Sequence, residues 1–228
     1  MLVLGVDSTS DAATAALLRD GVLLCEYTQN QKKTHSVKML PMIESMLSDL
    51  EIELKDIDVF ACGIGPGSFT GVRIGAATVR AFCDSLEKCA VAVTSLEALS
   101  HNVNSFDGII VSLVFARDGE CYTQAFENGE EIFSPCVMTI DEIIEFAKDK
   151  KCLFVGDGAV INKEALARVG ASFAKGRHNV ISGASIAEIG YKKALLGEVG
   201  NSNIIAPLYL RKSQAEREYD EKHKGEEK

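Results

Sequence analysis

A glycine-rich stretch at residues 65–75 constrains the fold more than any other part of the chain. It reads G-P-G-S-F-T-G-V-R-I-G and follows the short apolar run 59–62, which predicts a buried strand. Residues 72–83 contain no proline and predict a helix, so the stretch joins a strand to a helix. Its glycines permit positive φ and close backbone approach, and a loop at a helix N-terminus is suited to hold an anion. The same loop is equally suited to close packing of another protein's helix, or to a purely structural turn.

Two catalytic loops do not fit this stretch. A phosphate-binding P-loop needs G-x-x-x-x-G-K-[ST], but counted from Gly65 the second glycine position is Thr70, and no lysine follows. A nucleophile elbow needs G-x-S-x-G, and Ser68 has Pro66 and Thr70 at the two glycine positions. Ser68 and Thr70 are instead suited to cap the start of the helix.

The overall composition is that of a soluble globular protein. The chain has 228 residues, of which 46% are hydrophobic and 25% charged, enough apolar material for a core. No apolar run approaches the roughly 20 residues that a membrane-spanning helix needs. The strand-like run 2–6 follows Met1 directly and leaves no room for a signal peptide. We therefore expect a cytoplasmic protein with no membrane partner.

Charge and ligand-type residues argue against nucleic-acid and metal binding by the chain alone. The net charge is −9, from 24 Lys and Arg against 33 Asp and Glu, and the sequence shows no Lys/Arg cluster. An acidic surface repels phosphate backbones, so RNA would be held by another subunit. The seven cysteines form no C-x-x-C pair and the four histidines no H-x-x-x-H pair. We expect reduced core cysteines and no metal.

The two halves of the chain repeat one pattern. Residues 2–28 predict three strands, the last two joined by an Asp-Gly hairpin turn. The same order returns at 109–133, with an Asn-Gly turn, and a later strand runs into a second glycine loop at 156–158. Such an internal duplication predicts an α/β protein of two lobes whose glycine loops and first turns face one cleft. We assign residues 1–104 to the N-terminal lobe, 105–211 to the C-terminal lobe and 212–228 to a charged, flexible tail.

The polar turn after the first strand begins Asp7-Ser8-Thr9. A carboxylate and two hydroxyls at this place could meet a phosphate or its metal. They could equally form a turn that satisfies its own backbone.

Two helices are candidates for a docking surface. In the first, residues 36–50, an apolar stripe is widened by Met39, Met42 and Met46, and Met adapts to varied surfaces; the stripe is either core or a partner-binding face. In the helix after the glycine stretch, Gly71 and Gly75 lie four residues apart, which lets a second helix approach closely. Together they predict a surface for another subunit.

Several motifs, in one order from residue 2 to residue 211, carry a family resemblance. The eleven-residue glycine stretch is the most specific of them. The supporting motifs are D-S-T at 7–9, H-S with L-P at 35–41, S-L-E-A-L at 95–99, A-R-x-x-E-x-Y at 116–122, G-D-G at 156–158 and P-x-Y-L-R at 207–211. Together they resemble the bacterial TsaB (YeaZ) family of the actin-like ATPase (ASKHA, RNase H-like) superfamily.

This resemblance implies a fold and a function. The fold is α/β, with two tandem actin-like lobes of mixed sheets flanked by helices. The function is that of an accessory subunit that binds and activates the transferase TsaD, with the small ATPase TsaE, in making N6-threonylcarbamoyladenosine at position 37 of tRNA. The resemblance also implies a homodimer when the chain is alone, and contact with tRNA only indirectly, through the complex.

One segment bears on catalysis. The transferase carries H-x-E-x-H, with both histidines on a metal, where this chain reads S-L-E-A-L. Ser95 and Leu99 stand at the two histidine positions, and neither replaces an imidazole. Phe115 stands where the family usually has Asp. The resemblance therefore implies a pseudo-enzyme with no catalytic residue, no metal and no required cofactor, whose cleft is a vestigial site with weak ATP or ADP binding.

Three other functions stay open. A small-molecule kinase or ATPase of the same superfamily would turn over ATP as an isolated chain. A glycoprotease-like metallopeptidase would show chelator-sensitive proteolysis. A purely homodimeric scaffold would have no TsaD partner.

The candidate residues form two groups. The vestigial nucleotide cleft comprises Asp7, Ser8, Thr9, Gly65, Gly67, Ser68, Gly156, Asp157 and Gly158. The partner interface comprises His35, Met39, Met42, Ile43, Met46, Phe69, Thr70, Gly71, Val72, Arg73, Gly75, Ala76 and Val79.

Overall fold

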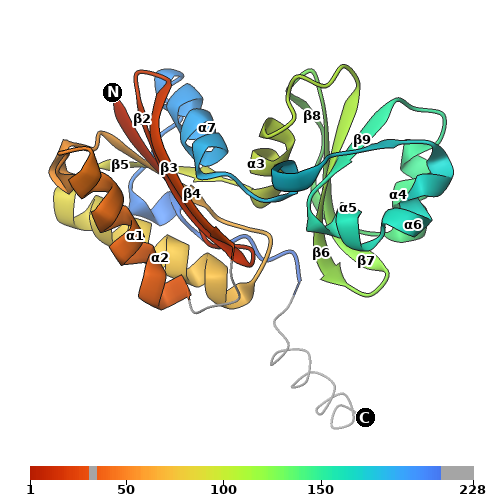
Figure 1. Cartoon of the computed structure of the whole chain (residues 1–228), viewed down its shortest axis with the longest axis horizontal. Helices are drawn as coiled ribbons and strands as arrows, with labels where there is room; N and C mark the ends of the chain where they lie inside the picture. Colours follow the sequence, from red (N-terminus) through yellow and green to blue (C-terminus); the bar gives the residue numbers. More distant parts are fainter. Residues whose placement is uncertain (31–34, 212–228) are drawn as a thin grey trace, which may run out of the picture.

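The computed structural model describes residues 1–30 and 35–211, and it contains two five-stranded mixed sheets (Figure 1). The first sheet has the order β3-β2-β1-β4-β5, in which β1 to β3 form an antiparallel meander and β1, β4 and β5 run parallel. Its strands are β1 (Leu2–Asp7), β2 (Ala12–Arg19), β3 (Val22–Asn30), β4 (Val59–Gly63) and β5 (Cys89–Val93).

The second sheet repeats this topology with the order β10-β9-β6-β7-β8. Strands β6 to β8 are antiparallel, and β6, β9 and β10 run parallel. Its strands are β6 (Ile109–Arg117), β7 (Glu120–Glu127), β8 (Glu130–Thr139), β9 (Cys152–Val155) and β10 (Ser172–Phe173). The matching strand orders confirm the predicted fold class, two lobes of mixed sheets flanked by helices.

The helices make alternating layers with the sheets (Figure 1). α1 and α2 cover one face of the first sheet, α3 and α7 pack between the two sheets, and α4 to α6 cover the far face of the second sheet. The helices are α1 (His35–Asp49), α2 (Phe69–Leu86), α3 (Ser95–His101), α4 (Ile140–Ala147), α5 (Asp157–Ile161), α6 (Lys163–Leu166) and α7 (Gly183–Leu195). Short 3-10 helices lie at Leu54–Asp56, Ala167–Val169, Gly176–Asn179 and Ser202–Ile204.

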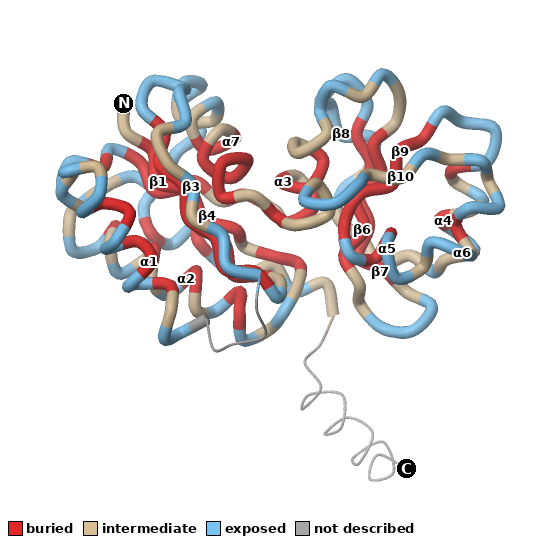
Figure 2. Tube along the Cα trace, in the orientation of Figure 1, coloured by how far each residue is buried: buried red, intermediate tan, exposed pale blue. Residues whose placement is uncertain are grey.

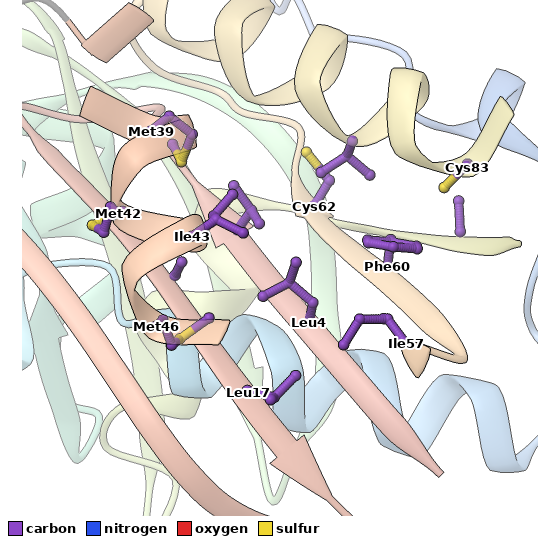
Figure 3. Packing of buried hydrophobic residues seen from close by; sticks show 14 of the residues in the cluster. Leu4, Leu17, Met39, Met42, Ile43, Met46, Ile57, Phe60, Cys62 and Cys83 are labelled. Carbon is purple, nitrogen blue, oxygen red and sulfur yellow. The ribbon is translucent and has the colours of Figure 1, made fainter. Parts of the chain in front are cut away.

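The methionine stripe of α1 is core, which corrects its assignment to the partner interface. Met39, Met42, Ile43 and Met46 are all buried in one apolar cluster. Figure 3 shows them beside strand residues such as Leu4. The reason is that α1 packs on β2 and β3 and, together with α2, covers the apolar face of the first sheet. Burial of each large apolar side chain contributes about 1.5–3 kcal/mol. In Figure 2 the buried segments, drawn in red, likewise lie where the helices and strands face the core.

The C-terminal part of the chain returns to the first lobe. The sequence pattern assigns residues up to 211 to the second lobe, but α7 packs on β1, β2 and β4 of the first sheet. Gly5 permits this contact, because a Cβ there would lie 2.6 Å from the backbone nitrogen of Ala187. Ile205, farther along, is buried in the core beneath α1 and α2. The duplicated sequence pattern carries no sign of this exchange, because α7 is set by tertiary packing.

Element boundaries follow the sequence closely where the pattern is strong. α2 begins at Phe69, earlier than predicted, and Ser68 caps it by accepting from the Gly71 N–H. Pro41 lies inside α1 and does not end it. The short elements α5, α6 and β10 were not predicted. The predicted tail 212–228 lies outside the described residues, among which no helix is both long and apolar enough to span a bilayer.

Candidate functional site

A cavity of about 390 Å³ lies between the two lobes. The turn after β1, the glycine stretch and the end of β6 line it, together with Asp157 and the segment that leads into α7. Four of the nine predicted cleft residues are in its wall: Thr9, Gly67, Ser68 and Asp157. The duplicated pattern therefore brings both glycine loops to one cavity, as predicted.

Asp7 lies behind this wall and is completely buried. Its carboxylate accepts hydrogen bonds from the Thr9 N–H (3.0 Å) and the Thr9 hydroxyl (3.0 Å). The Thr9 hydroxyl also shares a 2.8 Å hydrogen bond with the Ser95 hydroxyl. Burial raises the pKa of Asp7 from 3.8 to about 6, and the bonds from Thr9 offset only part of this rise. No cationic side chain is hydrogen-bonded to it in the described structure.

The glycine stretch holds the turn that follows β1. A Cβ at Gly67 would overlap the Thr9 carbonyl oxygen, and one at Gly71 would overlap the Ser8 carbonyl oxygen. The Ser68 N–H donates to the Thr9 carbonyl (2.7 Å), and the Ser8 hydroxyl donates to the Gly71 carbonyl (2.8 Å). The glycines are therefore required for close approach within this chain.

The predicted helix-docking groove on α2 is consequently occupied. A Cβ at Gly75 would lie 2.8 Å from the Ser8 hydroxyl oxygen and 3.8 Å from the Cys62 sulfur. Gly71, Gly75, Val72, Ala76 and Val79 are all buried. This corrects their assignment to a partner interface. Small residues at four-residue spacing indicate close packing, but they do not indicate whether the same chain or another protein packs against them.

The second glycine loop positions Asp157. Gly156 has φ +108°, and the Asp157 Oδ1 accepts from the N–H groups of Phe115 (3.0 Å) and Gly158 (2.8 Å). The carboxylate reaches the cleft, but the surrounding protein raises its pKa, and the two backbone donors oppose this effect. Phe115 keeps a polar role through its backbone, while the residue lines the cavity.

The other predicted cleft residues support the wall from behind. Asp7, Ser8, Gly65, Gly156 and Gly158 are buried and do not line the cavity.

Sequence reasoning missed two asparagines in the cavity wall, Asn30 and Asn179. Asn179 accepts from the Gly156 N–H (2.9 Å) and donates to the Ala174 carbonyl (2.9 Å). The segment that leads into α7 carries no motif, so nothing local marked Asn179.

Arg73 of the glycine stretch holds the C-terminal segment 205–211, which we call the clasp. Its Nε donates to the Tyr209 hydroxyl (2.8 Å), and the Tyr209 ring stacks on Phe69 with centroids 4.5 Å apart. The Leu208 N–H donates to the Ile64 carbonyl (2.7 Å). Arg211 reaches the second lobe, where it pairs with Glu120 at 3.1 Å. The clasp thus joins the two lobes beside the glycine stretch.

Three members of the predicted interface, Phe69, Thr70 and Arg73, retain exposed surface, and two of them hold the clasp. The side chain of His35 lies outside the described part of the chain. On α1 the exposed apolar residues are instead Val37 (70% exposed) and Leu40 (51%).

Comparison with known proteins identifies the family. The TsaB protein of Bacillus subtilis, named for tRNA threonylcarbamoyladenosine biosynthesis, is 31% identical over 98% of this chain and its own full length. The chain belongs to the TsaB family. TsaB of Escherichia coli is 30% identical over 57% of each chain. The family model "TsaD: tRNA N6-adenosine threonylcarbamoyltransferase" also matches, over residues 22–219.

Solved structures of TsaB-like and more distant proteins share the fold. YeaZ from Pseudomonas aeruginosa superposes with a TM-score of 0.77 at 22% identity, covering 92% of this chain and 99% of YeaZ. The ROK hexokinase of Thermus thermophilus superposes with a TM-score of 0.52 at 11% identity, covering 86% of this chain and 100% of the hexokinase. Both likenesses show the fold alone and place this TsaB-family chain among actin-like ATPase folds.

The positions of Ser95 and Leu99 are filled by internal contacts. Ser95 is buried and bonded to Thr9. Leu99 is buried against the second glycine loop, where a Cβ added at Gly156 would lie 3.0 Å from a Leu99 methyl group. Within residues 1–30 and 35–211, no group of three or more His, Cys, Asp or Glu is arranged to hold a metal ion.

Proposed function

We propose that this chain is a non-catalytic accessory subunit in the N6-threonylcarbamoyladenosine modification of tRNA. In this proposal it binds and activates the transferase TsaD, together with TsaE. The observation that carries the proposal is the near full-length similarity to Bacillus subtilis TsaB, a protein named for this biosynthesis. The match to the transferase family model fits a subunit that shares its fold with the enzyme it assists.

The docking surface we assign is the outer face of α1 and α2. We call it the α1–α2 ridge and define it by Val37, Leu40, Pro41, Arg73 and Ala77, all exposed. Apolar side chains as exposed as Val37 and Leu40, on a helix whose other face is fully buried, suit a protein partner. The same ridge would pair two copies of this chain when the transferase is absent.

The cleft supports a structural role over a catalytic one. Ser95 and Leu99 stand where the transferase has its metal-binding histidines, and both are buried in internal contacts. The Thr9 hydroxyl is bonded to Asp7 and Ser95, and the Ser68 N–H to the Thr9 carbonyl. With these groups already engaged, we expect at most weak binding of ATP or ADP and no required cofactor.

Reconstitution tests the proposal. Purified tRNA, TsaD, TsaE and the synthase that makes threonylcarbamoyl-AMP are combined with and without this chain, and the modified adenosine is measured by mass spectrometry. We expect product only with the chain present. Equal product without it would contradict the activating role, and ATP turnover by the isolated chain would favour the kinase alternative.

A further inference from the structure

Positive charge gathers in one segment of this acidic protein. Residues 148–178 contain seven Lys and Arg against three Asp and Glu, although the whole chain has a net charge of −9. The seven basic residues are Lys148, Lys150, Lys151, Lys163, Arg168, Lys175 and Arg177, and every one is exposed. Other residues separate most of them along the chain, which is why the sequence shows no cluster.

The topology brings these residues to one edge of the second sheet. β10 is the outermost strand and runs parallel to β9. Lys150 and Lys151 directly precede β9, and Lys175 and Arg177 follow β10. The connection between the two strands carries Lys163 and Arg168, and Lys163 lies beside β10, where its Nζ is over the Phe173 ring. We call this set the basic edge. Figure 1 shows β9, α4 and α6 on the side of the second lobe away from the first sheet.

Two of these lysines share a hollow with an aromatic ring. Lys163 and Lys175 line a cavity of about 260 Å³ together with Phe173. The Lys163 Nζ lies 5.7 Å from the centroid of the Phe173 ring. The Lys150 Nζ similarly lies 3.9 Å from the centroid of Phe146. These contacts hold the ammonium groups at the surface without neutralising them.

Within residues 1–30 and 35–211, only one of the seven basic residues forms an ion pair. Among the described residues, Lys151 forms an ion pair with Asp107 (2.6 Å), and no ion pair involves the other six. Of the three acidic residues in the segment, Asp157 is bonded to backbone donors in the cleft, which leaves Asp149 and Glu164. The neighbouring helix α4 bounds the basic edge with its own exposed acidic residues.

We propose that the basic edge contacts phosphates of the tRNA substrate once the chain is assembled with the transferase; this rests on the function proposed above. Each Lys or Arg placed on a phosphate releases bound counterions and gains affinity without reading sequence. The net charge of −9 keeps the isolated chain from binding RNA tightly. A tRNA already held by the transferase brings its phosphates to the edge at high effective concentration. The chain then touches tRNA directly, which departs from the purely indirect contact expected from the sequence.

Charge reversal at the edge tests this proposal. The variant Lys163→Glu/Lys175→Glu/Arg177→Glu is compared with Arg19→Glu/Lys55→Glu/Lys192→Glu, which reverses three exposed basic residues of the first lobe. Both are assembled with TsaD and TsaE, and the KM for tRNA and the salt dependence of tRNA binding are measured. We expect the edge variant to raise KM about tenfold near 0.15 M salt and to reduce the slope of log Kd against log salt by about 2, because each lost phosphate contact changes it by roughly 0.7–0.9. In the control variant, the KM and the slope should each change by less than half as much.

The outcomes separate the two proposals. If the wild-type chain stimulates modification and the edge variant matches the control, the proposed contact between the basic edge and tRNA is wrong and the accessory function stands. If the edge variant fails to assemble with TsaD, the surface faces protein and the tRNA proposal is again wrong. If the wild-type chain gives no stimulation, the accessory function itself fails. Size-exclusion elution of each variant beside the wild type checks that all are folded.

Discussion

At the scale of the residue, Asp7 is held in a state that costs stability at neutral pH. Its pKa is about 6 in the folded chain and 3.8 in the unfolded one, because burial disfavours the carboxylate. Between these two pH values the folded state binds more protons than the unfolded state. Stability from this group is therefore fully present below about pH 4 and is lost as the pH rises through 6.

Replacing Asp7 by Asn should stabilise the chain at pH 7.5 by about 2–3 kcal/mol, since one pKa unit corresponds to about 1.4 kcal/mol. The gain should shrink toward zero at pH 4, where both residues are neutral in the folded state. Urea unfolding at the two pH values measures it. Asp84→Asn, which removes a charge from an exposed position on α2, is the control. A variant with no advantage at pH 7.5 would mean that Asp7 is not buried as a charge.

Gly71 tests the close packing of the glycine stretch. Gly71→Ala should destabilise the protein by about 3 kcal/mol or more, because the added Cβ would overlap the Ser8 carbonyl oxygen. This loss should occur although Ala is the better helix former by about 1 kcal/mol. Thermal unfolding measures it, with Ala81→Gly at an exposed site of α2 as the control, expected to cost about 1 kcal/mol. A Gly71→Ala variant as stable as the wild type would place the Ser8 turn elsewhere.

At the scale of the element, the sequence predicted what repeats locally and missed what depends on packing. The strands of both meanders and the β4–α2 unit follow from alternation, hairpin turns and the proline-free run after Gly71. The apolar stripe of α1 was visible too, but a stripe does not say whether its own sheet or another protein covers it. Met46, which the sequence placed in the partner interface, is therefore core. Leu40, which it did not place there, is exposed. The brief β10 has only two residues and no periodicity to detect.

The α1–α2 ridge gives a prediction at this scale. Val37→Asp/Leu40→Asp should weaken binding to TsaD at least tenfold, because two charges would be buried in an apolar contact. Both side chains are exposed in the single chain, so its stability should change by less than about 1 kcal/mol. Co-purification with tagged TsaD and isothermal titration measure the effect. Val22→Asp, at an exposed apolar residue of the β2–β3 hairpin, is the matched control, and equal binding by both variants would contradict the ridge.

At the scale of the whole molecule, the lobes are tied together at separate places in the chain. Asn102, after α3, donates to the carbonyls of His178 (2.9 Å) and Val180 (2.8 Å), so the two chain crossings between lobes are bonded to each other. The clasp adds a link beside the glycine stretch through Tyr209 and the Arg211–Glu120 pair. No local sequence pattern predicts either link, because each joins residues that lie far apart in the sequence. The sequence therefore predicts the fold of each lobe but not the contacts between the two lobes.

The contacts of Tyr209 predict how the clasp responds when this aromatic ring is lost. Tyr209→Ala removes both the stack on Phe69 and the hydroxyl that accepts from Arg73, so the segment 205–211 should detach from the glycine stretch. We expect a loss of about 1–2 kcal/mol in unfolding free energy and at least tenfold faster hydrogen exchange at the Leu208 amide, which donates to Ile64. Tyr209→Phe keeps the stack and should change exchange by less than threefold. If Tyr209→Ala left the Leu208 amide as protected as in the wild type, the backbone bond to Ile64 alone would hold the clasp, and the contacts of Tyr209 would not be needed for it.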